Sequence, residues 1–395
     1  MRINHLSQRM RFKKLFRGLL SLAGIVMLVG SALAQTSYLY VESDIGNPQN
    51  KNSVFGFSID GTGNLTALPG SPYLTGGSGI FASSGSEFNA DQEVITNPTG
   101  TLLYAVNGHS NTISAFTINA DGTLTTLRGS PFPSGGQDPV SIGLSGSFMV
   151  VANKNEDPNQ DTTADNPNYS TFRVKSNGSL TLNSSATIEL AVDSSPAQVL
   201  MWPKGSVVFG LEFKTSRIAT YSFNKQGLMT ELSFVGPPPT SGGEFLGEIL
   251  HPKKRILYAG VLNRAEVAVY TYDVAGNLTF IRTVPNPGSD ICWLKTNAAG
   301  TRLYTSESLS RTISVYDLSD SLNPVLLQHI APANTAGPIT NIALEPTEAF
   351  FYAICGPTLR IFNIDGSGML NETLDPVTLT GVGTGMPLGL ATIRK

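Results

Sequence analysis

The stretch LYAVNGHSNTISAFTINADGTLT, residues 103–125, contains the pattern on which the rest of the chain is built. A short apolar segment leads through a polar turn into alternating apolar and small polar residues, and the stretch ends in Gly-x-Leu-Thr. Alternation with a period of two, bounded by Gly, Asn and Asp, is typical of short antiparallel strands. The stretch therefore predicts a series of short strands joined by tight turns.

The same pattern returns three more times in clear form, in residues 257–279, 303–316 and 351–362. Counting weaker copies, it recurs about every 46 to 65 residues, and a four-strand unit repeated at such a period is typical of a β-propeller. A propeller closes into one domain, so the repeats predict a single domain where length alone would allow two or three.

The first 34 residues differ from the repeats in composition. They begin with six cations and no acidic residue: Arg2, Arg9, Arg11, Lys13, Lys14 and Arg17. An apolar run, Leu19–Val29, and the small-residue site Ala32-Leu33-Ala34 follow, as in a secretory signal peptide. We expect cleavage before Gln35 and export to the periplasm or out of the cell, with no membrane span left afterwards. A retained anchor is the alternative, although the run is short for a span.

Each blade of the propeller should contain strands A to D, from the centre of the ring to its rim. Strand B is found seven times: Tyr38–Val41, Leu103–Val106, Phe148–Ala152, Val207–Leu211, Ile256–Gly260, Arg302–Thr305 and Phe350–Ile354. Six of these follow an apolar segment that suits strand A: Glu93–Thr96, Pro139–Leu144, Ala197–Met201, Phe245–Leu250, Ile291–Leu294 and Ile339–Leu344.

The first B strand has no A strand before it, because it begins just after the leader. A matching segment, Pro387–Ile393, stands at the far end of the chain. We expect it to complete the N-terminal blade, which would remove the open edges of an unclosed array. The predicted fold is all-β, a seven-bladed propeller over residues 35–395 that the C-terminal strand closes.

Charge and cysteine content narrow the function. Removing the six leader cations from 26 basic residues leaves 20, against 29 acidic residues, a net charge of −9. Such a surface argues against nucleic acid as a partner, since phosphate binding depends on Lys and Arg. Cys292 and Cys355 leave two possibilities open, separate buried thiols or a disulfide. The oligomeric state is not predicted.

The longest irregular segments all join D to A or B to C, and in a propeller both kinds of connection emerge on the same face. Long loops on one face suggest a recognition surface there, although surface loops also lengthen without function. Nine titratable residues stand at the top of an A strand or just beyond a B strand: His109, Asp138, Lys154, Glu212, Lys214, Glu244, Arg264, Asp290 and Glu307. We expect them near the channel mouth, where they would bind a small polar ligand. A solvated rim of paired charges is the alternative.

No metal or cofactor site is predicted. The acidic residues Glu156, Asp157, Asp161 and Asp165 lack the spacing of a calcium hand, and the histidines have no zinc-site spacing.

The repeat, from Leu103-Tyr104-Ala105-Val106-Asn107 to Asp121-Gly122-Thr123-Leu124, resembles the seven-bladed lactonase-like propellers. That family includes propeller-type 6-phosphogluconolactonases and cycloisomerases, and the repeat also resembles the YVTN repeats of surface-layer proteins. The resemblance covers essentially the whole chain after the leader. It implies the propeller fold and, for lactonase members, an Arg-His pair at the top of one A strand with a Glu after the next B strand.

This chain departs from that family pattern. Asp290 and Ile291 occupy the Arg-His positions, and Ser308 takes the place of the Glu, with Glu307 one position earlier. Loss of the Arg and His removes an oxyanion-stabilising cation and a proton carrier.

Two functions remain. The first is a lactonase-like propeller that binds a small polar ligand or a cell-envelope component on its top face, without 6-phosphogluconolactonase activity. The second is a hydrolase of a lactone or similar cyclic ester, in which Glu244 or Glu307 would activate water and Arg264 or Lys214 would stabilise the oxyanion.

Overall fold

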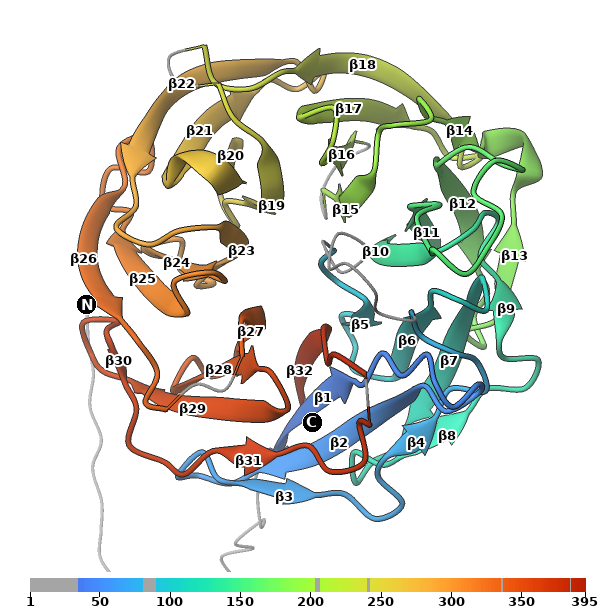
Figure 1. Cartoon of the computed structure of the whole chain (residues 1–395), viewed down its shortest axis with the longest axis horizontal. Helices are drawn as coiled ribbons and strands as arrows, with labels where there is room; N and C mark the ends of the chain where they lie inside the picture. The colour runs from blue at the N-terminus through green and yellow to red at the C-terminus, as the bar shows by residue number, and fades with distance from the viewer. Residues whose placement is uncertain (1–34, 81–89, 203–206, 240–241, 335–336, 384) are drawn as a thin grey trace, which may run out of the picture. The chain divides into compact units, whose positions relative to one another are not determined.

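The computed structural model describes residues 35–80, 90–202, 207–239, 242–334, 337–383 and 385–395. The predicted signal peptide lies outside these residues, and the chain from Gln35 onward forms one compact unit. Seven antiparallel sheets surround a central channel (Figure 1), which confirms the predicted seven-bladed propeller. We number the blades 1 to 7, from the blade that contains β1.

The strands of each blade follow one another from the channel to the rim. The innermost strands, in blade order, are β32 (Leu390–Arg394), β5 (Val94–Thr96), β10 (Pro139–Ser145), β15 (Pro196–Met201), β19 (Phe245–Leu250), β23 (Ile291–Thr296) and β27 (Ile339–Leu344). The second strands are β1 (Ser37–Glu42), β6 (Leu102–Asn107), β11 (Phe148–Asn153), β16 (Val207–Glu212), β20 (Ile256–Val261), β24 (Arg302–Glu307) and β28 (Phe350–Cys355). Their observed bounds lie within three residues of the predicted A and B strands.

The third strands are β2 (Ser53–Ile59), β7 (Thr112–Ile118), β12 (Asn168–Val174), β17 (Arg217–Phe223), β21 (Glu266–Tyr272), β25 (Thr312–Asp317) and β29 (Thr358–Ile364). Blades 4 to 6 end in unbroken outer strands, β18 (Met229–Val235), β22 (Leu278–Pro285) and β26 (Val325–Ile330). The other blades end in pairs of short strands: β3 (Leu65–Ala67) with β4 (Tyr73–Leu74), β8 (Leu124–Thr126) with β9 (Phe132–Pro133), β13 (Leu180–Leu182) with β14 (Ile188–Glu189), and β30 (Leu370–Asn371) with β31 (Val377–Thr378). Two short 3-10 turns, η2 (Ser184–Ala186) and η3 (Leu262–Arg264), complete the described elements.

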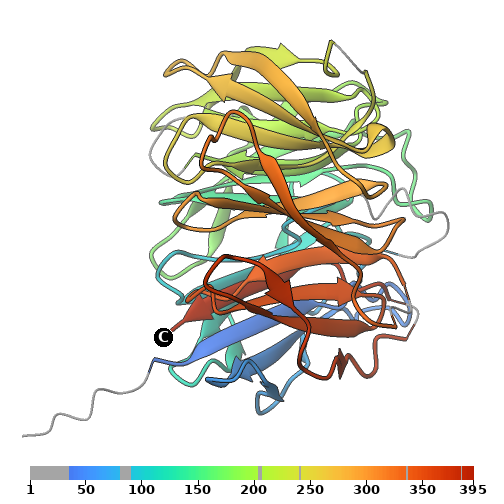
Figure 2. The same ribbon diagram turned by 90° about the vertical axis from the view of Figure 1, so that its left-hand side faces the viewer.

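The ring closes as predicted, because β32 pairs with β1 inside blade 1. Leu390 lies opposite Val41 and Ile393 opposite Tyr38 in an antiparallel register. The pairing continues past the strands, where the Glu42 N–H donates to the Gly389 carbonyl at 3.1 Å. Figure 2 shows the C-terminus beside β1 from the side.

The repeated tyrosine of strand B joins five of the blades to the next one; strand B of blades 3 and 4 has no tyrosine. The Tyr40 hydroxyl, in blade 1, donates to the Gly122 carbonyl of blade 2 at 2.7 Å, and Tyr104 donates to Gly178 of blade 3 at 2.8 Å. Tyr258, Tyr304 and Tyr352 make the same type of bond across three further blade interfaces. The tyrosine of the repeat therefore stabilises contacts between blades as well as the sheet in which it lies.

The glycine of the repeat's Gly-x-Leu-Thr turn allows this contact. Gly122 has φ 80°, a backbone conformation that side chains rarely adopt, and a Cβ there would lie 2.2 Å from the Tyr38 ring. Only a glycine satisfies both the turn and the close approach of the neighbouring blade.

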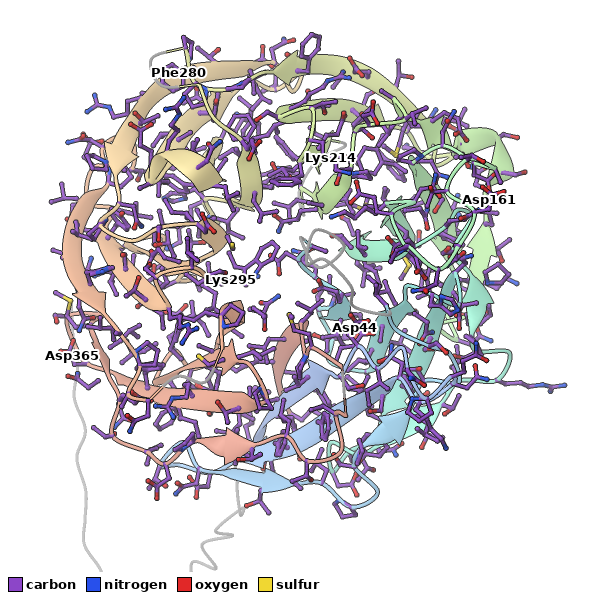
Figure 3. The ribbon with its side chains drawn as sticks, in the orientation of Figure 1. Asp44, Asp161, Lys214, Phe280, Lys295 and Asp365 are labelled. Atoms are coloured by element: carbon purple, nitrogen blue, oxygen red, sulfur yellow. The ribbon has the colours of Figure 1, made fainter. Side chains whose placement is uncertain are left out.

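A polar cluster in the channel connects four blades. Asp91, just before β5, is buried and accepts from Gln198 Nε2 at 2.8 Å, Lys295 Nζ at 3.2 Å and Asn341 Nδ2 at 2.9 Å. These partners lie on β15, β23 and β27, and Figure 3 shows Lys295 at the inner edge of its blade. The Asp91 cluster thus spans the channel between strands that do not pair with one another.

Glu248 on β19 is fully buried, and neither of its carboxyl oxygens has a hydrogen-bond partner. Burial raises the pKa of Glu248 to about 8, so the folded protein holds it as a neutral acid near pH 7. In an unfolded chain the same group ionises above about pH 4.5. Between that pH and about 8, the unfolded state releases a proton that the folded state keeps, so the free energy of unfolding falls as pH rises.

Two observations complete the fold. Cys292 and Cys355 are both free and buried, so the structure shows two thiols and not the disulfide. Within the described ranges, no helix has the length and apolar character needed to cross a membrane.

We predict that Tyr104→Phe lowers the free energy of unfolding by about 1–2 kcal/mol, because the buried Gly178 carbonyl loses its donor. Thermal unfolding of the purified protein measures this loss. Ser222→Ala is the control, since the exposed Ser222 hydroxyl donates to the Thr230 carbonyl within the same blade. Equal melting temperatures for Tyr104→Phe and the wild type would show that the bond between blades contributes nothing.

We predict that Glu248→Gln becomes more stable relative to the wild type as pH rises from 5 to 8, by about 2–4 kcal/mol over that range. The glutamine cannot ionise, so unfolding no longer gains from release of this proton. Denaturant unfolding at several pH values measures the difference. Glu189→Gln, at an exposed position on β14, should show no such trend. A constant difference between Glu248→Gln and the wild type would contradict the raised pKa.

Candidate functional site

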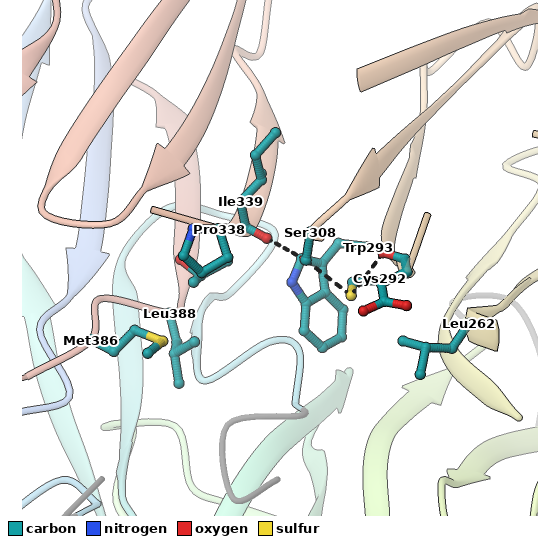
Figure 4. A pocket seen from close by; sticks show the side chains of 10 residues that line it. Leu262, Cys292, Trp293, Ser308, Pro338, Ile339, Met386 and Leu388 are labelled. Carbon is teal, nitrogen blue, oxygen red and sulfur yellow. Dashed lines mark hydrogen bonds between the residues drawn. The ribbon is translucent and has the colours of Figure 1, made fainter. Parts of the chain in front are cut away.

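A pocket of about 280 Å³ lies at the top of the ring, where A strands begin and B strands end (Figure 4). Its wall comes from blades 5, 6 and 7 and from the segment that leads into β32 of blade 1. The lining residues are Leu262, Asp290, Cys292, Trp293, Ser308, Pro338, Ile339, Thr340, Met386 and Leu388. We call this the channel-mouth pocket.

The backbone places Asp290 at the pocket through a recurring irregularity. Asp290 has φ 58° immediately before β23, and Asp138 and Ser195 have φ 55° and 53° immediately before β10 and β15. Asp tolerates this left-handed conformation better than most residues. After each of these residues, the pairing register between the first and second strands of the blade shifts, as at a β-bulge. The shift changes the direction in which the side chains at the start of the first strand point.

The same geometry brings the ends of strands A and B together. The Ser308 N–H donates to the Asp290 carbonyl at 2.8 Å, just as the Lys154 N–H donates to the Asp138 carbonyl at 2.8 Å. In these blades, the residue just before strand A and the residue just after strand B are therefore neighbours. In blade 6 this pairing puts Asp290 beside Ser308.

The hydroxyl and thiol groups of the pocket wall are held by the protein itself. Ser308 Oγ donates to the Ile339 carbonyl at 2.6 Å, and Thr340 Oγ1 donates to the Pro387 carbonyl at 2.6 Å. Burial raises the pKa of Cys292 to about 12, so this group is a thiol at neutral pH and a poor nucleophile. None of the three is arranged as an activated nucleophile with a base beside it.

Among the residues that the structure describes, Asp290 is the one carboxyl group that lines the pocket, and it is half-buried. Burial raises the pKa of Asp290 above its ordinary value. Its position at a pocket wall, with no cation in the lining, leaves it able to accept a hydrogen bond or a proton from a molecule in the pocket.

Of the nine predicted site residues, the structure places Asp290 against this pocket and the other eight elsewhere. Glu307 is fully buried and accepts from Asn286 Nδ2 at 2.8 Å, Thr305 Oγ1 at 2.5 Å and Thr312 Oγ1 at 2.9 Å. Burial raises the pKa of Glu307 to about 7, although these hydrogen bonds lower it. Its contacts show a role within blade 6, and a catalytic role for it stays a prediction.

A second group gathers on the connection between β11 and β12. Lys214 Nζ lies 2.7 Å from Glu156 Oε1, and Lys154 Nζ lies 3.7 Å from Glu156 Oε2. His109 Nδ1 lies 2.5 Å from Asp157 Oδ2. The structure therefore brings together three of the predicted site residues, His109, Lys154 and Lys214, through Glu156 and Asp157, which were not among the nine.

Asp138 belongs to the same region, and its Oδ2 accepts the Glu156 N–H at 3.2 Å. Burial raises the pKa of Asp138 to about 7, although nearby Lys154 acts in the opposite direction. This group contains ion pairs between blades 2, 3 and 4. It fits the alternative stated above for the nine residues, a rim of paired charges.

The remaining three residues lie apart. Glu212 pairs with Arg217 at 3.9 Å and accepts from Thr215 Oγ1 at 3.0 Å. Glu244 and Arg264 are exposed at the top of blade 5. Their roles in catalysis or binding stay predictions.

Sequence reasoning missed two features. Trp293, on β23, lines the pocket with its indole Nε1–H unpaired, and buried Glu42 and Glu93 have unpartnered oxygens near the top of blades 1 and 2. Burial raises the pKa of both glutamates well above the ordinary value. Across the described ranges, no group of three or more His, Cys, Asp or Glu is arranged to hold a metal ion.

Comparison with known proteins agrees with this architecture. No family model matches the chain. The chain is 26% identical over 179 residues to a 6-phosphogluconolactonase of Xenorhabdus nematophila, covering 45% of this chain and 53% of that protein. It is 22% identical over 261 residues to a 6-phosphogluconolactonase of Erwinia tasmaniensis, covering 62% and 71%. The chain thus spans only about half of the first relative.

Solved structures resemble the chain over nearly its whole length. A putative 6-phosphogluconolactonase of Bacteroides fragilis superimposes with a TM-score of 0.71 at 18% identity, covering 90% of this chain and 98% of that one. The periplasmic gluconolactonase PpgL of Pseudomonas aeruginosa superimposes with a TM-score of 0.69 at 17% identity, covering 91% and 99%. At such identities these likenesses show the fold alone. The solved structures thus share the propeller fold, and in sequence the chain is distantly similar to proteins named 6-phosphogluconolactonase.

Proposed function

We propose that the protein is an exported lactonase-family propeller that binds a small polar ligand in the channel-mouth pocket and lacks 6-phosphogluconolactonase activity. The observation that carries the proposal is the pocket itself. It lies where the family resemblance predicts the catalytic Arg, His and Glu, but Asp290, Ile291 and Ser308 stand there instead.

Each replacement removes a catalytic capacity. Asp290 is an acid where the family has a cation, so it cannot stabilise a developing oxyanion. Ile291 is fully buried and cannot carry a proton. Ser308 is too weak a base to activate water, and its hydroxyl already donates to Ile339.

Export is part of the proposal and rests on the leader sequence, with its cations, apolar run and Ala32-Leu33-Ala34 site. A phosphorylated sugar lactone is a cytosolic metabolite, so an exported protein would not meet it. A cell-envelope component remains the other kind of ligand, and nucleic acid is disfavoured by the net negative charge.

A hydrolase of an uncharged lactone or cyclic ester is the second candidate, which the position of Asp290 favours. A water oxygen would attack the carbonyl carbon while Asp290 accepts the water's proton. The ring C–O bond would then break, and the leaving oxygen would take the proton back from Asp290. Glu244, Glu307 and Arg264 would have no part in this version, since none of them lines the pocket.

We predict that purified protein hydrolyses 6-phosphogluconolactone no faster than buffer alone. Proton release in weakly buffered solution at pH 7 measures the rate, because each ring opening frees one acid. Turnover well above the spontaneous rate would contradict the proposal.

A screen of small sugars, lactones and cell-wall fragments by thermal unfolding tests binding. A ligand of the pocket should stabilise the wild type and Asp375→Asn, an exposed control on blade 7, more than it stabilises Asp290→Asn. For any lactone that is hydrolysed, Asp290→Asn should lower kcat by about 100-fold or more while Asp375→Asn leaves it unchanged. Equal activity of the two variants would contradict the hydrolase mechanism.

A further inference from the structure

Among the described residues, the lining of the channel-mouth pocket contains an acidic group but no basic one, which limits the chemistry of its ligand. Its described lining includes one carboxyl group, Asp290, and no Lys, Arg or His. Proteins that bind phosphate or carboxylate groups supply cations or several converging N–H donors. This pocket supplies neither, and an ionised Asp290 would repel an anion.

The pocket also contains one hydrogen-bond donor that the protein leaves unused. Trp293 is 2% exposed, and none of the described residues accepts a hydrogen bond from its Nε1–H. Figure 4 shows the nitrogen edge of the ring facing the side of the pocket formed by Pro338 and Leu388. A buried donor without a partner is unfavourable, and an acceptor oxygen on a ligand would remove that cost.

The remaining wall is largely apolar and limits size. Leu262, Ile339, Met386 and Leu388 supply aliphatic surface, and the Ser308 and Thr340 hydroxyls donate to backbone carbonyls. A volume of about 280 Å³ lies just below the range of about 300–1,000 Å³ usual for drug-sized ligands. The space therefore suits a single substituted ring.

From these features, and on the basis of the proposed function, we infer that the pocket selects an uncharged, single-ring ligand. Its carbonyl oxygen accepts from Trp293 Nε1, and one of its hydroxyl or N–H groups donates to Asp290. Trp293 and Asp290 are then the residues that determine specificity, the first by requiring an acceptor and the second by rejecting anions.

The test compares a neutral probe with its phosphorylated counterpart. D-Glucono-1,5-lactam has a ring carbonyl, an N–H and hydroxyl groups and is not hydrolysed like a lactone, and its 6-phosphate differs only in charge and size. The chain has two tryptophans, so Trp202→Phe leaves Trp293 as the single emitter. Trp202 packs against Tyr272 in another part of the ring and does not line the pocket. Titration of Trp293 fluorescence then reports on the pocket directly.

We expect the lactam to change the emission of Trp293 saturably and its 6-phosphate to bind at least tenfold more weakly. Calorimetric titration of Trp293→Phe, which keeps the ring shape, should show lactam affinity lowered about tenfold, the usual effect of one lost hydrogen bond. Asp290→Asn should narrow the difference between the two probes, because the repelling charge is gone. Asp375→Asn should leave all of these values unchanged.

Equal or tighter binding of the 6-phosphate, or unchanged lactam affinity in Trp293→Phe, would overturn this inference while leaving the pocket as a ligand site. Failure of both probes to alter Trp293 emission at millimolar concentration would overturn the inference and the proposed function together. Thermal unfolding of each variant establishes that it has folded, and if Trp293→Phe does not fold, Asp290→Asn alone decides the charge selectivity.

Discussion

The hydrogen bond from the repeated tyrosine to the turn of the next blade is the interaction on which the ring depends. A blade is a small sheet with two apolar faces, and each face is covered only when a neighbour packs against it. The Tyr104 ring packs between blades 2 and 3, and its hydroxyl donates to the Gly178 carbonyl. One side chain therefore fills the interface and gives a buried carbonyl its hydrogen bond. The same residue makes this bond at five of the seven blade interfaces, so the same spacing recurs there, while β11 and β16 have no tyrosine.

The tyrosine contact also explains how much of the fold could be read from the sequence. The Leu-Tyr pair and the Gly-x-Leu-Thr turn recur because each must contact the other across a blade interface, as the Tyr40 hydroxyl contacts the Gly122 carbonyl. A pattern that repeats for a physical reason is legible without a structure. The closing strand could be predicted in the same way, since β1 would have had no inner partner unless the C-terminal segment supplied it.

The site was harder to predict from the sequence, because its geometry depends on small shifts in strand register that the repeat pattern does not show. Asp290 and Glu307 belong to the same blade and were both placed at the rim by sequence, yet one lines a pocket and the other is buried among Asn286, Thr305 and Thr312. The bulge after Asp290 separates their environments, and no residue pattern marks it. Trp293 reads as an ordinary core residue in sequence, and its unused N–H becomes visible only when every possible acceptor around it has been located.

The pairing of β1 with β32 also sets an order of events during synthesis. Val41 lies in β1, and its partner Leu390 lies 349 positions later in β32. Blade 1 therefore stays without its inner strand until β32 has been synthesised, after the strands of the other six blades. Once the ring has formed, Thr36 and Lys395 exchange backbone hydrogen bonds at 2.8 and 2.9 Å, so the two ends of the propeller are neighbours. Joining them and cutting the chain at an exposed rim turn would give a circular permutant whose blades keep the same order around the axis.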